Sequence, residues 1–176
     1  MRTPKIHFGC GKRVIPGWFH VDIADFPHID ANNLDHVGEG YAEVFYACHV
    51  LEHFSREEIP DVLKEWKRAL KRGGTLRLAV PDFTAWAAVY TQTHDLALVH
   101  GAILGGQKDA TDFHKTLFTY RSLNTTLEDA GFCNIQRWDW RETEHAHVDD
   151  YSQSYYPHMD KEHGRLMSLN IEATKP

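Results

Sequence analysis

The stretch Lys5-Ile6-His7-Phe8-Gly9-Cys10-Gly11 decides the fold, and His20-Val21-Asp22 follows it closely along the chain. A short apolar run that ends in glycines is typical of a buried strand followed by a tight turn. Glycine lets the backbone pass close to a ligand because no Cβ is in the way. The carboxylate of Asp22, at the end of a second strand, could accept hydrogen bonds from both hydroxyls of a ribose. The pattern predicts an adenosine-containing cofactor.

The composition is that of an ordinary soluble protein and excludes several classes. The 176 residues carry a net charge of −6, which argues against a general nucleic-acid-binding surface. No run of eighteen apolar residues predicts a membrane span, and Met1-Arg2-Thr3-Pro4 leads directly into a strand, so we expect no signal peptide. Cys10, Cys48 and Cys133 lie far apart along the sequence, which favours free thiols in a reducing cytoplasm over disulfides. We expect one cytoplasmic domain over residues 1–176.

Hydrophobic periodicity predicts strands that alternate with helices, which indicates an α/β domain. The expected strands are 5–8, 18–22, a short one at Ile29-Asp30, 43–48, 75–80, 132–140 and 166–174. The expected helices are 55–72, 84–104 and 120–130. Ser55 and Glu58 match a capping box, and Gly73-Gly74 would stop the first helix. Only six residues separate Gly11 from Trp18, so the first crossover has room for one helical turn at most.

The segment His49-Val50-Leu51-Glu52-His53 matches the string of an inverted zinc-protease signature. Such a site needs both histidines on one face of a helix, whereas this segment directly follows a predicted strand. We therefore favour a loop that lines a ligand crevice at the carboxyl end of the strand. A histidine-rich cap over the core is the alternative.

Three further groups of polar residues have two interpretations each. Residues 145–150 carry metal-ligand side chains, but a solvated acidic loop is the favoured interpretation, so we expect no metal site. Tyr151, Tyr155, Tyr156 and His158 could form a substrate lid or pack on the sheet. His114, in a polar loop over 106–118, could be a general base or a surface histidine.

Several motifs occur in an order that resembles class I S-adenosylmethionine-dependent methyltransferases, in particular the small type-11-like group. They are Ile6-His7-Phe8-Gly9-Cys10-Gly11, Val21-Asp22, Asp30, Cys48-His49-Val50-Leu51-Glu52-His53, Leu70-Lys71-Arg72-Gly73-Gly74 and Val80-Pro81-Asp82. The resemblance implies a Rossmann-like, mostly parallel sheet of seven strands in the order 3-2-1-4-5-7-6. The last strand would be antiparallel, with helices on both faces and a truncated first crossover helix.

The resemblance also implies a binding site for S-adenosylmethionine. The glycine turn would hold the methionine part, Asp22 the ribose hydroxyls, Asp30 the adenine amino group, and the backbone at Cys48 and His49 the sulfonium end. The residues assigned to the cofactor are His7, Gly9, Cys10, Gly11, Asp22, Ile23, Asp30, Ala31, Cys48 and His49. The chain departs from the group's pattern at His7 and at Lys12-Arg13, which replaces a third glycine. With the first crossover helix missing, the site would be open, so we expect a substrate loop, a second copy or a partner subunit to cover it.

The expected reaction is O- or N-methylation of a small polar or sugar-like acceptor by in-line displacement. Our hypothesis makes His53 or His114 the general base, with Asp82 orienting the acceptor. We expect neither a nucleic-acid partner nor a membrane span. The alternatives are a cofactor-binding partner subunit without catalysis and a metal-dependent hydrolase that uses the histidine clusters.

Overall fold

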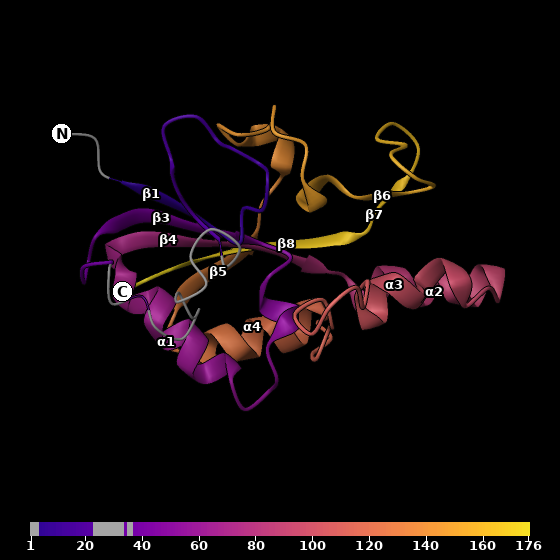
Figure 1. Cartoon of the computed structure of the whole chain (residues 1–176), viewed down its shortest axis with the longest axis horizontal. Helices are drawn as coiled ribbons and strands as arrows, with labels where there is room; N and C mark the ends of the chain where they lie inside the picture. The colour runs from indigo at the N-terminus through magenta and orange to yellow at the C-terminus, as the bar shows by residue number, and fades with distance from the viewer. Residues whose placement is uncertain (1–3, 23–33, 35–36) are drawn as a thin grey trace.

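The computed structural model describes residues 4–22, 34 and 37–176. Six strands form one sheet in the order β2-β1-β3-β4-β8-β5 (Figure 1). They are β1 (Lys5–Phe8), β2 (Phe19–Val21), β3 (Ala42–Cys48), β4 (Leu70–Pro81), β5 (Cys133–Arg137) and β8 (Ser168–Thr174). The two short strands β6 (Tyr155–Tyr156) and β7 (Arg165–Leu166) pair with each other.

The helices fall between these strands along the chain. The α-helices are α1 (Ile59–Ala69), α2 (Phe83–Thr93), α3 (Ala97–Leu104) and α4 (Tyr120–Asp129). Three single-turn 3₁₀ helices are η1 (Leu51–His53), η2 (Trp140–Glu142) and η3 (Tyr151–Gln153). None of the helices in the described ranges is long and apolar enough to cross a membrane.

The sheet topology confirms the expected class I arrangement. Strands β1, β2, β3 and β4 are parallel, and β8 runs antiparallel to both β4 and β5. The observed order equals the predicted order without its third strand. That strand, expected at Ile29-Asp30, lies outside the described residues, as do the expected cofactor residues Ile23 and Ala31.

One face of the sheet carries the larger hydrophobic core, and α1 and α4 lie on it (Figure 1). Side chains alternate along a strand, so Phe8 and Phe45 point toward the helices. Trp66 of α1 is fully buried between them, with ring centroids 5.2 Å from Phe45 and 5.7 Å from Phe8. The apolar residues at helical spacing in α1 thus anchor the helix to the carboxyl half of the parallel strands.

We expected helices on both faces of the sheet, but the opposite face is covered in another way. In the described chain it carries the loop over residues 10–18 and the segment over 138–154, which contains η2 and η3 (Figure 1). A smaller cluster joins Ile15 and Trp138 to Tyr46 and Cys48 of β3. The loop is too short for a crossover helix, so the truncation expected from the sequence is present.

Two predicted helices have different boundaries. Helix α1 begins at Ile59, although Ser55 and Glu58 exchange the backbone-to-side-chain hydrogen bonds of a capping box, at 2.7 and 3.3 Å. It ends at Ala69, and residues 71–72 belong to β4 instead of a last helical turn. The helix expected over 84–104 is split into α2 and α3, because His94 adopts a left-handed conformation that ends α2.

Candidate active site

A cavity lies where β1, β2 and β3 end, at the edge where open α/β sheets bind ligands. Its volume is about 520 Å³, within the range of small-molecule sites. It is lined by Phe8, Gly9, Asp22, His49, Val50, His53, Phe54, residues 108–112 and Lys115. The polar loop expected over 106–118 therefore forms one wall of the site.

Gly9 is required where it stands in the turn after β1. Its φ is +66°, and an added Cβ would collide with a methyl group of Val50. The N–H of Gly9 donates to the carbonyl of Val21 at 2.8 Å, which ties the turn to the end of β2. The backbone of the turn consequently forms part of the cavity wall.

Asp22 lines the same cavity, and its carboxylate accepts a hydrogen bond from the N–H of Gly11 at 2.6 Å. Cys10 is buried, and its thiol donates to the carbonyl of Gly11 at 3.5 Å. Neither Cys10 nor Gly11 is among the described residues that line this cavity or the adjoining cavity described below. The glycine turn thus offers Gly9 directly and holds Asp22 through Gly11.

His7 and Cys48 lie on the opposite face of the sheet from Phe8 and the large core. The His7 ring stacks on Tyr46 with centroids 5.1 Å apart, and burial lowers its pKa to about 4. Burial also raises the pKa of the Cys48 thiol. Neither side chain is among the described residues that line the large cavity. The assignment of His7 and Cys48 to the cofactor stays a prediction, and their positions give neither side chain a direct contact with this cavity.

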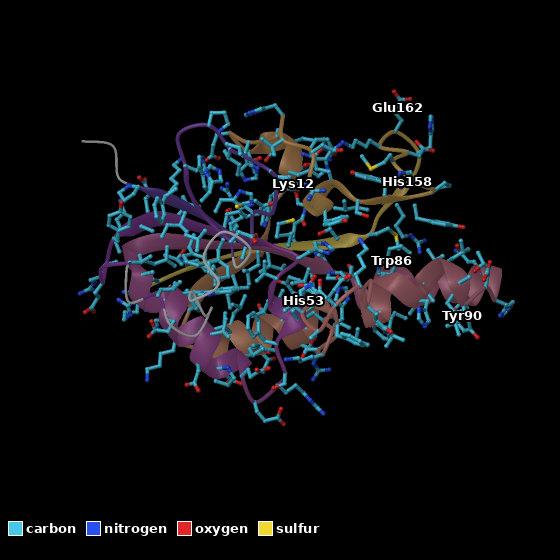
Figure 2. All side chains as sticks on the ribbon, in the orientation of Figure 1. Lys12, His53, Trp86, Tyr90, His158 and Glu162 are labelled. Carbon is cyan, nitrogen blue, oxygen red and sulfur yellow. The ribbon has the colours of Figure 1, made fainter. Side chains whose placement is uncertain are left out.

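A second cavity of about 330 Å³ adjoins the first. The two share His49, His53, Lys108 and Asp112 as lining residues. The second cavity is further lined by Pro81, Trp86, Gly101, Ala102, Gly106, His114, Tyr151, Ser154 and Met167. His53 comes from η1 and Trp86 from α2 (Figure 2). Two cavities therefore meet at the histidines that follow β3.

His49 stands at this junction in a left-handed conformation, with φ of +54°. Its Nδ1 lies 3.3 Å from Oε1 of Glu52, and its ring packs on that of Tyr151 with centroids 5.0 Å apart. Burial, followed by the neighbouring histidines, lowers the pKa of His49 to about 3. The ring is therefore neutral across the physiological range. Tyr151 is the one member of the predicted tyrosine lid that lines either cavity within the described residues.

His53 and His114, the two alternative candidates for the general base, are brought together from separate elements. Their rings meet edge to face with centroids 4.9 Å apart. Nδ1 of His53 lies 3.1 Å from the carbonyl of Phe113, and Nδ1 of His114 lies 2.9 Å from that of Ala102. A carbonyl only accepts, so the geometry assigns the proton to Nδ1 and the lone pair to Nε2 in each neutral ring. Burial lowers the pKa of both rings.

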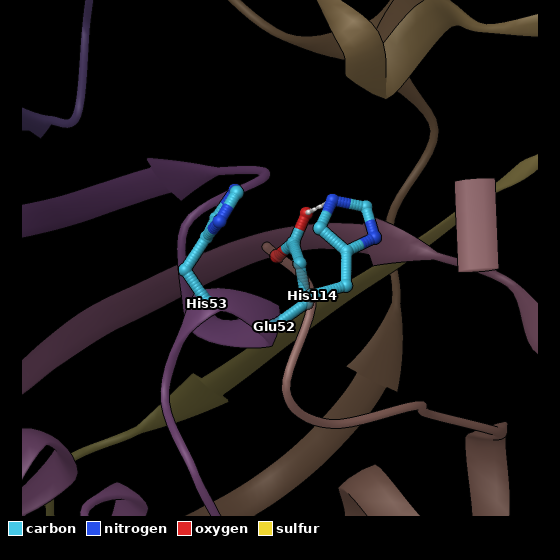
Figure 3. A group of neighbouring side chains, drawn as sticks. All are labelled: Glu52, His53 and His114. Carbon is cyan, nitrogen blue, oxygen red and sulfur yellow. Dashed lines mark ion pairs between the residues drawn. The ribbon is translucent and has the colours of Figure 1, made fainter. Parts of the chain in front are cut away.

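Glu52 lies between these two histidines (Figure 3) and is 1% exposed. Among the described residues, neither carboxylate oxygen has a hydrogen-bond partner, and Nε2 of His114 lies 4.0 Å from Oε1. Burial raises the pKa of Glu52 to about 8. From the sequence, Glu52 is only one position of the signature string, and no role is predicted for it.

The other candidates have structural partners. The Asp82 carboxylate caps α2 by accepting from the N–H of Thr84 at 2.9 Å, and it lines neither cavity within the described chain. His145 stacks on Tyr46 at 4.6 Å, and Asp150 accepts from the Tyr46 hydroxyl at 2.7 Å. His145 and Asp150 of the loop over 145–150 are thus buried against the sheet, whereas His147 and Asp149 are exposed.

Comparison with known proteins finds a family model that matches part of the chain. Residues 9–78 match the family model of a methyltransferase domain, Methyltransf_11, a range that includes the glycine turn, η1 and α1. No curated protein has a sequence that matches this chain.

Solved structures share the fold at low sequence identity. A SAM-dependent methyltransferase from Archaeoglobus fulgidus is 18% identical, with a TM-score of 0.58, over 98% of this chain and 86% of that one. A possible histamine N-methyltransferase from Thermotoga maritima is 15% identical, with a TM-score of 0.56, over 100% and 83%. A complex of the Haloferax volcanii Trm112 methyltransferase activator with a putative methyltransferase matches at 11% identity and a TM-score of 0.55, over 99% and 72%.

These comparisons confirm the resemblance to class I, type-11-like methyltransferases. The domain match and the shared fold support enzymatic methyl transfer with S-adenosylmethionine as the cofactor.

Proposed function

Since residues 9–78 match the family model of a methyltransferase domain, we propose that the chain methylates an oxygen or nitrogen of a small polar or sugar-like acceptor. The observation that carries this proposal is the pair of cavities that meet at His49 and His53. In-line transfer needs the methyl donor and the acceptor on opposite sides of one point, with water excluded. The larger cavity would hold the cofactor and the smaller one the acceptor.

The residues of the larger cavity fit an adenosine-containing cofactor. Gly9 lines this cavity with backbone alone, and Asp22 lies at the end of β2. We assign the ribose hydroxyls to the carboxylate of Asp22 and the methionine part to the turn. When bound, the cofactor supplies an activated methyl group. The chain supplies the alignment and the dry surroundings.

The residues of the smaller cavity fit a polar acceptor of modest size. Trp86 and Tyr151 offer apolar ring surface, and Lys108, Asp112 and His114 offer polar contacts. A sugar-like molecule presents both kinds of surface. The net charge of −6 disfavours a polyanion such as a nucleic acid.

Proton removal from the acceptor has two candidates on the chain. His53 and His114 both line the acceptor cavity, and each has its lone pair at Nε2. Their lowered pKa values keep them in the neutral form that a general base needs. Asp82 caps the helix that carries Trp86, so we propose that it positions the acceptor wall through α2.

We further propose that residues 1–176 work as a single cytoplasmic domain whose site is covered by a second copy or a partner subunit. Free thiols at Cys48 and Cys133 fit a reducing compartment. The methyltransferase of Haloferax volcanii, which shares the fold, forms a complex with an activator protein.

The direct test is calorimetry with S-adenosylmethionine and S-adenosylhomocysteine. Asp22→Ala should weaken binding about 10- to 100-fold, because hydrogen bonds to a charged group are lost. Asp22→Asn removes the charge but keeps an oxygen that accepts from the N–H of Gly11. It therefore separates the effect of a disturbed turn from the loss of the charged ribose contact. Asp129→Ala, at the exposed end of α4, is the matched control.

Unchanged affinity in Asp22→Ala would remove the basis for this cofactor site. A screen for labelled-methyl transfer across small hydroxyl and amine acceptors then tests catalysis. Binding without transfer to any of them would favour a non-catalytic partner subunit.

A further inference from the structure

The Glu52 carboxylate lies in an unusual environment for an acidic side chain. It is 1% exposed, and neither oxygen accepts a hydrogen bond from the described residues. Buried carboxylates are normally hydrogen-bonded, paired with a cation or bound to a metal, because desolvation without compensation costs several kcal/mol. The nearby Nδ1 of His49, at 3.3 Å, lacks hydrogen-bond alignment. The carboxylate therefore calls for a further ligand.

The two histidines beside Glu52 are oriented as metal ligands are. Each donates its Nδ1–H to a backbone carbonyl, Phe113 for His53 and Ala102 for His114. Histidines that bind metals nearly always donate the other ring N–H to such a partner, which fixes the tautomer and the ring plane. One ligand atom from each of Glu52, His53 and His114 lies within 4.8 Å of the other two.

The backbone holds this cluster together across two elements. Glu52 and His53 belong to η1, whereas His114 belongs to the loop over 106–118. The N–H groups of Lys115 and Thr116 both donate to the carbonyl of Glu52, at 2.8 and 3.1 Å. Tetrahedral ligands about 2.1 Å from a cation lie about 3.4 Å apart. The 4.0 Å between Nε2 of His114 and Oε1 of Glu52 needs only a small side-chain movement to reach that value.

From this geometry we propose that Glu52, His53 and His114 bind a divalent first-row transition-metal cation such as Zn²⁺ at the junction of the two cavities. Two imidazole nitrogens and one carboxylate oxygen are the ligand set of catalytic zinc and of non-haem iron. Mg²⁺ and Ca²⁺ prefer oxygen ligands alone. Three protein ligands leave a coordination position that a hydroxyl of the acceptor can occupy.

The catalytic part of this inference rests on the proposed methyl transfer. A cation that binds the acceptor hydroxyl lowers its pKa, so the O–H proton leaves to water. The oxygen then forms its bond to the methyl carbon as the carbon–sulfur bond breaks, which yields the methyl ether and S-adenosylhomocysteine. The cation uses the Nε2 lone pairs, so it takes the place of a histidine general base.

The test measures zinc binding to the full-length, chelator-treated protein by calorimetry. Wild type should bind one equivalent, and Co²⁺ should give a visible absorption band of a low-symmetry site. Glu52→Gln and His114→Ala should each weaken zinc binding at least about 100-fold. His100→Ala, at an exposed position on α3, should bind zinc as wild type does. Affinity for S-adenosylmethionine reports whether each variant is folded.

The outcomes separate the metal site from the proposed function. Absence of stoichiometric zinc binding, or binding that folded Glu52→Gln retains, overturns the site while leaving methyl transfer intact. Stoichiometric binding that both variants lose supports the site. If chelation then leaves the transfer rate unchanged, the role of the cation toward the acceptor is wrong. If S-adenosylmethionine fails to bind to wild type, the proposed function fails whatever the zinc result.

Discussion

Replacing His7 by phenylalanine should remove one identifiable source of acid sensitivity. The His7 side chain is 1% exposed, and its ring stacks on Tyr46 with centroids 5.1 Å apart. Its Nδ1 has no hydrogen-bond partner among the described residues. Burial lowers the pKa of His7 from 6.5 to about 4, outweighing the opposite effect of Asp150. Phenylalanine keeps the stacking surface and cannot take up a proton.

The sign and size follow from proton linkage. Between pH 6.5 and about 4 the unfolded chain binds a proton at His7 that the folded chain does not. The contribution of neutral His7 to the free energy of unfolding is therefore fully present above pH 6.5 and is lost as the pH falls toward about 4. Between pH 7 and pH 5 the contribution of His7 amounts to about 2 kcal/mol. The free energy of unfolding of His7→Phe should fall by about 2 kcal/mol less than that of wild type over this interval.

Urea denaturation at pH 7, 6 and 5, followed by circular dichroism and tryptophan fluorescence, measures this difference. His100→Phe makes the same chemical change at an exposed histidine and should keep the pH dependence of wild type. The comparison of slopes is independent of any constant destabilisation by the larger ring. Equal losses of stability in wild type and His7→Phe would refute the assignment of His7 as a buried neutral histidine.

Four more substitutions test the fold around the site, three by urea denaturation and one by amide hydrogen exchange. Gly9→Ala and Gly17→Ala share the strain of a positive φ, but only the first adds a collision with Val50, so it should cost about 1–3 kcal/mol more. Equal losses would show that the turn has room. Trp66→Ala should cost about 3–5 kcal/mol because it empties a fully buried site; a loss below 1 kcal/mol would contradict that packing. Arg68→Met removes hydrogen bonds to the carbonyls of residues 34 and 37, at 2.9 and 3.0 Å, and should speed amide hydrogen exchange at residue 37; unchanged exchange would count against this anchor.

The strands of the sheet were predictable because they have a clear apolar pattern and a turn signal at the end, whereas their order was implied by the resemblance to class I methyltransferases. Helix boundaries were harder to predict. Polar residues at 91–95 interrupt the apolar residues of 84–104, but no glycine or proline marks His94 as the residue that leaves the helical conformation. The cations at 71–72 suit a helix end as well as a strand, and the long pairing of β4 with its neighbours decides between them.

The candidate site divides in the same way. Gly9, Asp22 and His49 directly follow predicted strands, so their position at the cavity follows from topology. The alternation of β1 places Ile6 and Phe8 toward the helices and His7 on the opposite face. The assignment of His7 to the cofactor stays a prediction. The roles of Glu52 and of residues 108–112 depend on how a loop distant in sequence packs on η1, and no local pattern encodes that contact.

The short first crossover also explains why the C-terminal segment belongs to the site. A full crossover helix would cover β1 and β3 on the face where Tyr46 lies, so its absence leaves that face to other residues. The Tyr46 hydroxyl bonds to Asp150 there, and the Arg13 guanidinium lies 4.9 Å from the Tyr151 ring centroid. The same contacts that cover the sheet place Tyr151 on His49 at the junction of the two cavities. The loop after β1 therefore connects the turn at Gly9 to Tyr151, and a change in its length should alter both cavities.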